Sequence, residues 1–193
     1  MERLTPEDYF REALAVLGDY GSEALTIAVL CERLGITKGS FYHHFGGMPG
    51  FVTQLLDYWE REHSERLIMI SKAQPDPTLR IHNLTEIGVG LPHASEAAIR
   101  AWARSSPEVA EVTERVDRRR ERHLVGAISA LGIDRAQARV LARIALNVLV
   151  GVQQREHQVD LKRLRQMFEE INKLMFLEAD PDLVARLHDA TAG

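Results

Sequence analysis

The sequence has little of what marks several common classes of protein. It contains one cysteine, Cys31, in 193 residues, which excludes an internal disulfide and a multi-cysteine zinc site. We expect Cys31 to be a small buried apolar residue. No apolar run reaches the roughly 20 residues of a membrane span, and the N-terminus lacks the apolar segment of a signal peptide. We therefore expect a cytoplasmic protein with no membrane partner.

The sequence also lacks the excess of positive charge that is common in nucleic-acid-binding proteins. Its formal net charge is −4. Residues 1–50 contain four basic and seven acidic side chains, a net charge of −3. Counterion release from phosphates supplies much of the affinity for DNA. If this segment binds DNA, we expect its non-specific binding to be weak.

Helical signals follow one another along the chain. Helices are expected wherever apolar residues recur every three or four positions between caps, prolines and glycines. No segment alternates as a β-strand does, and we find no internal repeat. These patterns predict an all-α fold. The helices are expected near 6–18, 25–34, 38–45, 49–72, 78–87, 95–104, 107–131, 135–157 and 161–177.

The most informative segment is Leu25–Phe51. It is typical of two short helices joined by a tight turn at Gly35, with Thr37 as the cap of the second helix. Phe41 and Phe45 supply the apolar face of that helix. A short helix with small and hydrogen-bonding side chains at its front suits the DNA major groove. The side chains on its opposite face are those of Lys38, Ser40, Tyr42, His43 and His44.

Residues 34–45, LGITKGSFYHHF, follow the motif G-[VI]-[ST]-x-[GP]-[ST]-[LF]-Y-x-[HY]-F. Through this motif the chain resembles the tetracycline-repressor (TetR) family of bacterial transcription regulators. The helix count and the stretch 101–109 are also similar to members of that family. The resemblance implies a three-helix helix-turn-helix DNA-binding domain at 1–47 and a larger helical ligand-binding and dimerisation domain at 48–193.

The resemblance also implies roles for individual residues in the first domain. Thr26 would cap the first short helix and donate to a DNA phosphate. Lys38 and Ser40 would meet base edges or nearby phosphates, and His43 the backbone or a base. Phe41 and Phe45 would pack in the core. The complete set of implied DNA contacts is Thr26, Thr37, Lys38, Gly39, Ser40, Tyr42, His43 and His44.

Two positions depart from the family pattern. Met48 stands where the family usually has a lysine that holds a phosphate, and Gly50 is expected to loosen the first turn of the next helix. Together with the acidic charge, these departures keep a second interpretation open. In that alternative the chain is a family member with weak or lost DNA binding, which acts as a ligand-binding protein.

The last two long helices, near 135–157 and 161–177, are expected to form the interface of a homodimer. Each exceeds four turns, and a two-fold dimer is what palindromic half-sites require. The alternative is that both helices complete the core of a monomer. The apolar stripes that favour the dimer consist of Leu141, Ile144, Val148, Leu164, Phe168, Ile171 and Met175.

A ligand pocket is expected among polar groups that interrupt apolar helix faces. Each such residue, taken alone, also fits a satisfied polar group in the core or a half-exposed residue at a helix end. As a group they suggest aromatic walls with a few hydrogen-bonding groups. The candidates are Trp59, His63, His82, Trp102, Arg120, His123 and Asn147.

These features predict a ligand-responsive repressor that a small-molecule effector releases from a palindromic double-stranded DNA operator. We expect no catalytic residues, no cofactor and no enzymatic activity. The competing class is a metal-carrying helical bundle, because Glu60-x-x-His63 has the spacing of a di-iron ligand pair. That architecture needs the motif twice, and the sequence holds no second copy, so no metal site is expected.

Overall fold

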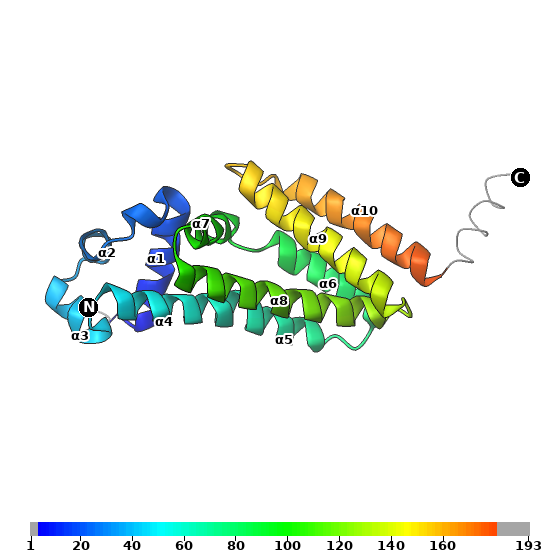
Figure 1. Ribbon diagram of the computed structural model, residues 1–193, viewed down its shortest axis with the longest axis horizontal. Coiled ribbons are helices and arrows are strands. Elements are labelled where there is room, and N and C mark those ends of the chain that lie inside the picture. The colour runs from blue at the N-terminus through cyan, green and yellow to red at the C-terminus, as the bar shows by residue number, and fades with distance from the viewer. Residues whose placement is uncertain (1–3, 181–193) are drawn as a thin grey trace, which may run out of the picture. The chain divides into compact units, whose positions relative to one another are not determined.

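The computed structural model describes residues 4–180, and these residues form helices and no strand. The predicted all-α fold with an N-terminal helix-turn-helix is therefore confirmed (Figure 1). No helix within this range is long and apolar enough to cross a membrane. The helices are α1 Pro6–Tyr20, α2 Ile27–Leu34, α3 Lys38–Phe45, α4 Met48–Glu60, α5 Arg66–Lys72, α6 Pro77–Val89, α7 His93–Ala103, α8 Pro107–Ser129, α9 Arg135–Arg155 and α10 Leu161–Ala179.

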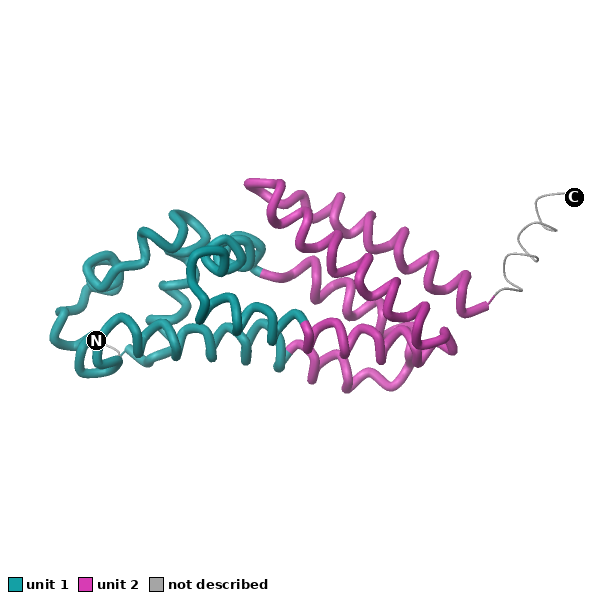
Figure 2. Tube along the Cα trace, in the orientation of Figure 1, with its two compact units in different colours: residues 1–66, 92–117 teal, residues 67–91, 118–193 magenta. Residues whose placement is uncertain are grey.

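The chain divides into two compact units, each assembled from two stretches of sequence (Figure 2). Unit 1 contains residues 1–66 and 92–117, and unit 2 contains residues 67–91 and 118–193. Helix α8 supplies its first part to unit 1 and its remainder to unit 2. This division describes how the helices pack against one another. The functional division between residues 47 and 48 stays a prediction.

Local signals account for the start of α1. Thr5 precedes the helix, Pro6 occupies its first turn, and the Thr5 backbone N–H donates to Asp8 Oδ2 at 2.7 Å. Proline suits this position because its missing N–H would have no helical partner. Tyr9 and Phe10 then begin the buried face of the helix, which anchors α1 in the core of unit 1.

The predicted continuous helix from 49 to 72 is interrupted. Arg61–Glu65 forms a π-helical turn between α4 and α5. Such turns insert one extra residue into an α-helix and are frequent at functional sites. Here the turn contains His63 and the buried Ser64.

The core of unit 2 uses residues that the sequence had suggested for a dimer interface. Leu141 on α9 is buried in this core, as are Leu164 and Phe168 on α10. Asn172 Nδ2 donates to Thr85 Oγ1 at 2.9 Å in the same core, which links α10 to α6. Most of the proposed stripe therefore packs within the subunit. Other apolar side chains of α9 and α10 are exposed: Val140, Ile144, Leu161, Met167 and Leu174.

Candidate DNA-binding surface and buried polar cluster

The two helices of the helix-turn-helix are defined by their caps. Thr26 Oγ1 accepts from the Val29 N–H, and Thr37 Oγ1 accepts from the Ser40 N–H, each at 3.2 Å. Gly35 ends α2 with φ 63°, a left-handed conformation that favours glycine. These contacts set the turn at which α2 stops and α3 begins.

The inner face of α3 is aromatic. The ring of Phe41 lies 5.1 Å from the rings of both Phe45 and Phe51, and Tyr9 lies 5.1 Å from Phe45. Phe41 is fully buried and Phe45 nearly so. The placement agrees with the packing role expected for both phenylalanines. Burial of this face fixes which side of α3 meets solvent.

The outer face of α3 carries the exposed candidates for DNA contact. Thr37, Lys38, Gly39 and His43 are exposed, and Tyr42 retains 52% of its accessible surface. A β-carbon at Gly39 would approach only Thr37 Oγ1, at 3.8 Å. The backbone at the front of the helix is therefore open to a close approach.

Ser40 and His44 differ from the other candidates because they are half-buried and face α1. Ser40 Oγ lies 3.5 Å from the hydroxyl of Tyr9, and the ring of His44 lies 5.6 Å from the ring of Tyr9. Sequence reasoning did not identify Tyr9. Its contacts position two of the proposed reading residues.

The junction between α3 and α4 explains both departures from the family pattern. Met48 is half-buried and packs against the core of unit 1. A β-carbon at Gly50 would overlap the carbonyl oxygen of Phe45. Glycine is therefore required at position 50 by the close approach of α4 to the end of α3, which is a different reason from the loosening expected from its propensity.

The positive charge of this region is mostly paired. Arg11 Nη2 lies 2.6 Å from Asp8 Oδ1, and Arg33 forms an ion pair with Glu12. Lys38 forms no ion pair with any of the described residues 4–180. Its ammonium is thus the cation that this face offers to a phosphate.

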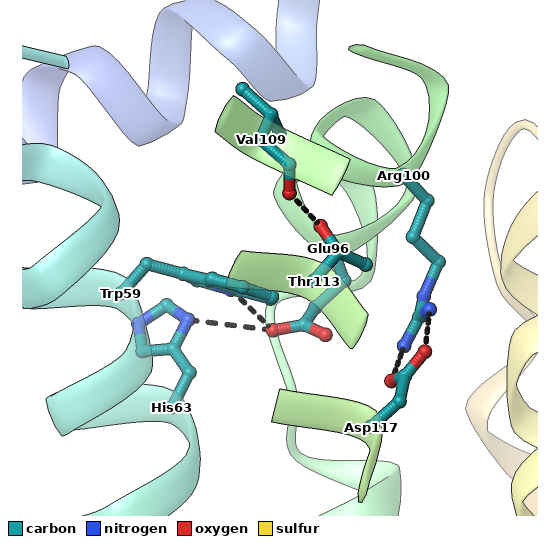
Figure 3. Close-up of polar contacts among 7 residues, drawn as sticks. All are labelled: Trp59, His63, Glu96, Arg100, Val109, Thr113 and Asp117. Atoms are coloured by element: carbon teal, nitrogen blue, oxygen red, sulfur yellow. Dashed lines mark hydrogen bonds and ion pairs between the residues drawn. The ribbon is translucent and has the colours of Figure 1, made fainter. Parts of the chain in front are cut away.

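A second polar site lies inside unit 1, where α7 meets the end of α4 (Figure 3). Glu96 has no accessible surface, and its Oε1 accepts from Trp59 Nε1 at 2.7 Å. The same oxygen lies 3.7 Å from His63 Nδ1, on the π-helical turn. A buried carboxylate requires such partners, because its desolvation is costly without them. Two predicted ligand residues, Trp59 and His63, therefore converge on Glu96.

Arginines neutralise the carboxylates around this cluster. Arg100 donates from Nη1 and Nη2 to the two oxygens of Asp117, both at 2.7 Å. Burial opposes the charged form of Arg100, but the hydrogen bonds and charge of Asp117 raise its pKa above the ordinary value. Arg115 Nη2 binds Glu60 Oε2 at 2.6 Å. Glu60, half of the proposed metal motif, is thus held by an arginine.

Trp59→Phe should lower the free energy of unfolding by about 2–4 kcal/mol, because it removes a donor to a buried carboxylate and leaves unfilled volume. Trp102→Phe is the matched control, since Trp102 is only half-buried, and it should cost less than about 1 kcal/mol. Denaturant unfolding followed by circular dichroism measures both. Equal decreases in the free energy of unfolding of the two variants would contradict a stabilising role for the hydrogen bond between Trp59 and Glu96.

The remaining predicted ligand residues do not share one environment. Trp102 lies in unit 1, half-buried against its core. His82 is exposed on α6, with its ring 5.6 Å from that of Phe176, and Asn147 is exposed on α9. Arg120 and His123 are half-buried on the unit 2 part of α8. Within residues 4–180, no group of three or more histidine, cysteine, aspartate or glutamate side chains is arranged to hold a metal ion.

Sequence reasoning missed Glu96. A signal was present, because Glu96 lies three positions before Ile99, on the apolar face of an alanine-rich helix. A carboxylate on that face must be buried with partners. The partners themselves lie 37 residues away at Trp59, beyond the reach of any local pattern.

Comparison with known proteins agrees with this geometry. Residues 10–55 match the family described as bacterial regulatory proteins, tetR family. The HTH-type transcriptional regulator BetI of Brucella abortus is 24% identical over 158 residues, which cover 79% of each chain.

Solved structures share the fold at low sequence identity. A putative TetR-family regulator from Rhodococcus sp. superposes with a TM-score of 0.74 at 14% identity, over 89% of this chain and 98% of that one. A putative regulator from Saccharomonospora viridis, solved in complex with choline, gives 0.73 at 15% identity, over 87% and 95%. With its capped helix-turn-helix and these matches, the chain is similar to the tetR family of bacterial regulatory proteins over residues 10–55 and shares the fold of solved regulators of that kind.

Proposed function

We propose that the protein is a homodimeric repressor that binds a palindromic operator and is released by a small molecule. The observation that carries this proposal is the outer face of α3. It presents Lys38, Tyr42 and His43 to solvent while Phe41 and Phe45 fix the inner face. Residues 1–47 would then be the DNA-binding domain, and residues 48–193 would bind the effector and the second subunit.

The proposed docking places the first turn of α3 in the major groove. Lys38 would meet a phosphate or a base edge, Tyr42 and His44 would donate to phosphates, and His43 would meet the backbone or a base. Thr26 and Thr37 lie at the start of their helices, where N–H groups and the helix dipole favour a phosphate. The exposed Gly39 would let the backbone approach the DNA closely.

Dimerisation would use the exposed face of α9 and α10. Val140 and Ile144, one helical turn apart on α9, are 51% and 41% exposed, and Met167 and Leu174 on α10 are 39% and 55% exposed. Large apolar side chains that stay exposed on two long helices favour an interface between subunits. A two-fold dimer would hold two copies of α3 about 34 Å apart, as adjacent half-sites require.

Effector responsiveness rests on the family and on the choline-bound neighbour from Saccharomonospora viridis. The effector would bind two conformations of the dimer with different affinity and so shift the spacing of the two α3 helices. Trp59 and His63 are the leading candidates for effector contact, because both converge on the buried carboxylate of Glu96 inside unit 1. Trp102, His82, Arg120, His123 and Asn147 stay candidates of lower rank.

Lys38→Ala and Tyr42→Ala should each weaken operator binding by about 1–3 kcal/mol, roughly tenfold or more, because each removes a contact to DNA. Fluorescence anisotropy with DNA flanking the protein's own gene measures the affinity. Arg104→Ala is the control, since Arg104 is exposed in unit 1 at the end of α7, outside the helix-turn-helix. Undiminished binding by both α3 variants would overturn the assignment of the reading helix.

A ligand-binding protein without DNA affinity is the second candidate function. Met48 at the position of the family's phosphate-holding lysine favours it, as does the acidic charge of residues 1–50. The same anisotropy experiment separates the two candidates. Wild-type protein that binds no fragment selected from genomic DNA, yet binds an effector, would favour this second function.

A further inference from the structure

A cluster of basic and hydroxyl side chains lies in unit 2, where the end of α5 meets α8. Ser71 is fully buried at the end of α5, and its Oγ lies 3.2 Å from Nε2 of His123 on α8. Lys72 follows Ser71 directly and is exposed. Arg80, one turn into α6, donates to the Gln74 carbonyl, and the Gln74 N–H donates to the Ser71 carbonyl at 3.2 Å, which brings Arg80 to the end of α5. We call Ser71, Lys72, Arg80 and His123 the basic cluster.

The cations of the basic cluster are not neutralised by carboxylates. The guanidinium of Arg80 donates to backbone carbonyls. Its Nε and Nη2 donate to the Gln74 carbonyl oxygen at 2.9 and 2.7 Å. Among residues 4–180, neither Arg80 nor Lys72 forms an ion pair. The neighbouring Asp76 carboxylate accepts from the Leu79 N–H at 2.8 Å as the cap of α6. The cluster therefore keeps its positive charge.

His123 lies within the electrostatic influence of these cations. Burial lowers the pKa of His123, and the positive charges of Lys72 and Arg80 lower it further. No carboxylate contributes to this shift. Burial and neighbouring cations both disfavour the imidazolium, and an anion bound beside the ring would favour it.

We infer that Ser71, Lys72, Arg80 and His123 form a binding site for a phosphate group. A phosphate carries close to two negative charges near pH 7 and three acceptor oxygens. The Lys72 ammonium and the imidazolium of His123 would donate to those oxygens, and the buried Ser71 hydroxyl would accept from His123 Nε2 and hold the ring in place. Arg80, fixed by its carbonyl partners, would contribute charge at long range. The inference is independent of DNA binding.

Phosphate should raise the pKa of His123 by about 1, because an opposite charge close to the ring favours the imidazolium. Two-dimensional NMR of the histidine rings in the full-length protein measures this pKa, with the resonance assigned from a His123→Gln variant. One arm uses inorganic phosphate and a second uses methyl phosphate, so that free phosphate and a phosphate ester are distinguished. Sodium chloride at matched ionic strength is the reference.

Lys72→Ala should weaken phosphate binding about tenfold, because it removes a charged hydrogen-bond donor. Lys162→Ala is the matched control, since Lys162 is also an exposed lysine of unit 2. Saturable binding of either phosphate compound, weakened only by Lys72→Ala, supports the site. A chloride effect equal to that of phosphate, or equal binding by the two lysine variants, overturns it.

Discussion

Gly50→Ala should lower the free energy of unfolding by about 3 kcal/mol, because the added β-carbon overlaps a backbone oxygen, which can move only with its helix. That oxygen belongs to Phe45, the last residue of α3. Relief of the overlap requires α3 and the first turn of α4 to separate. The variant should therefore also weaken operator binding, since the reading helix is displaced from its support.

Gly126→Ala is the matched control for this substitution. Gly126 lies within α8, and a β-carbon there would have no neighbour within 4 Å. Alanine should stabilise the helix at this position by about 0.5–1 kcal/mol. Denaturant unfolding compares the two variants with the wild type. If Gly50→Ala unfolds at the wild-type denaturant concentration, the close approach of α4 to α3 is not rigid in solution.

The double substitution Val140→Glu and Ile144→Glu should convert the proposed dimer to a monomer. Both side chains are large, apolar and exposed on one face of α9, so four buried carboxylates would face one another or apolar surface in the dimer. A monomer holds one half-site at a time. Operator affinity should therefore fall by roughly 10²–10⁴-fold as the second binding event is lost.

Sedimentation equilibrium and operator binding test this prediction together. The control is Met69→Glu with Leu79→Glu, which alters two apolar residues of unit 2, on α5 and α6, that are at least as exposed as Val140 and Ile144. The control should remain dimeric with native circular dichroism. A wild-type monomer, or a dimer that survives the changes on α9, would place the interface elsewhere or remove it.

The helices were predictable because their signals are local. Thr5 with Pro6, Thr37 and Gly35 mark ends through caps and turns that involve neighbouring residues. The packing partners of each face were less predictable. Leu141 and Phe168 follow the same period as exposed apolar residues, yet both are buried in the core of their own unit. Periodicity identifies an apolar face, but it does not tell a subunit core from an interface.

The polar sites were also predictable only in part. Resemblance to the family supplied the proposed reading residues of α3, but not the support that Tyr9 gives to Ser40 and His44. The bond between Trp59 and Glu96 joins helices distant in sequence. The π-helical turn at Arg61–Glu65 carries no composition that distinguishes it from an ordinary α-helix. Each missed feature depends on tertiary contacts rather than on neighbouring residues.

The pairing of Arg11 with Asp8 and of Arg33 with Glu12 affects how the protein would search a chromosome. Because these arginines are engaged within the subunit, Lys38 carries most of the charge available to phosphates on α3. A DNA-binding domain that releases few counterions binds non-specific DNA weakly, so it gains little from sliding along that DNA. If the protein binds an operator as proposed, we expect it to reach that site mainly by diffusion through solution, and to stay bound there as the salt concentration rises.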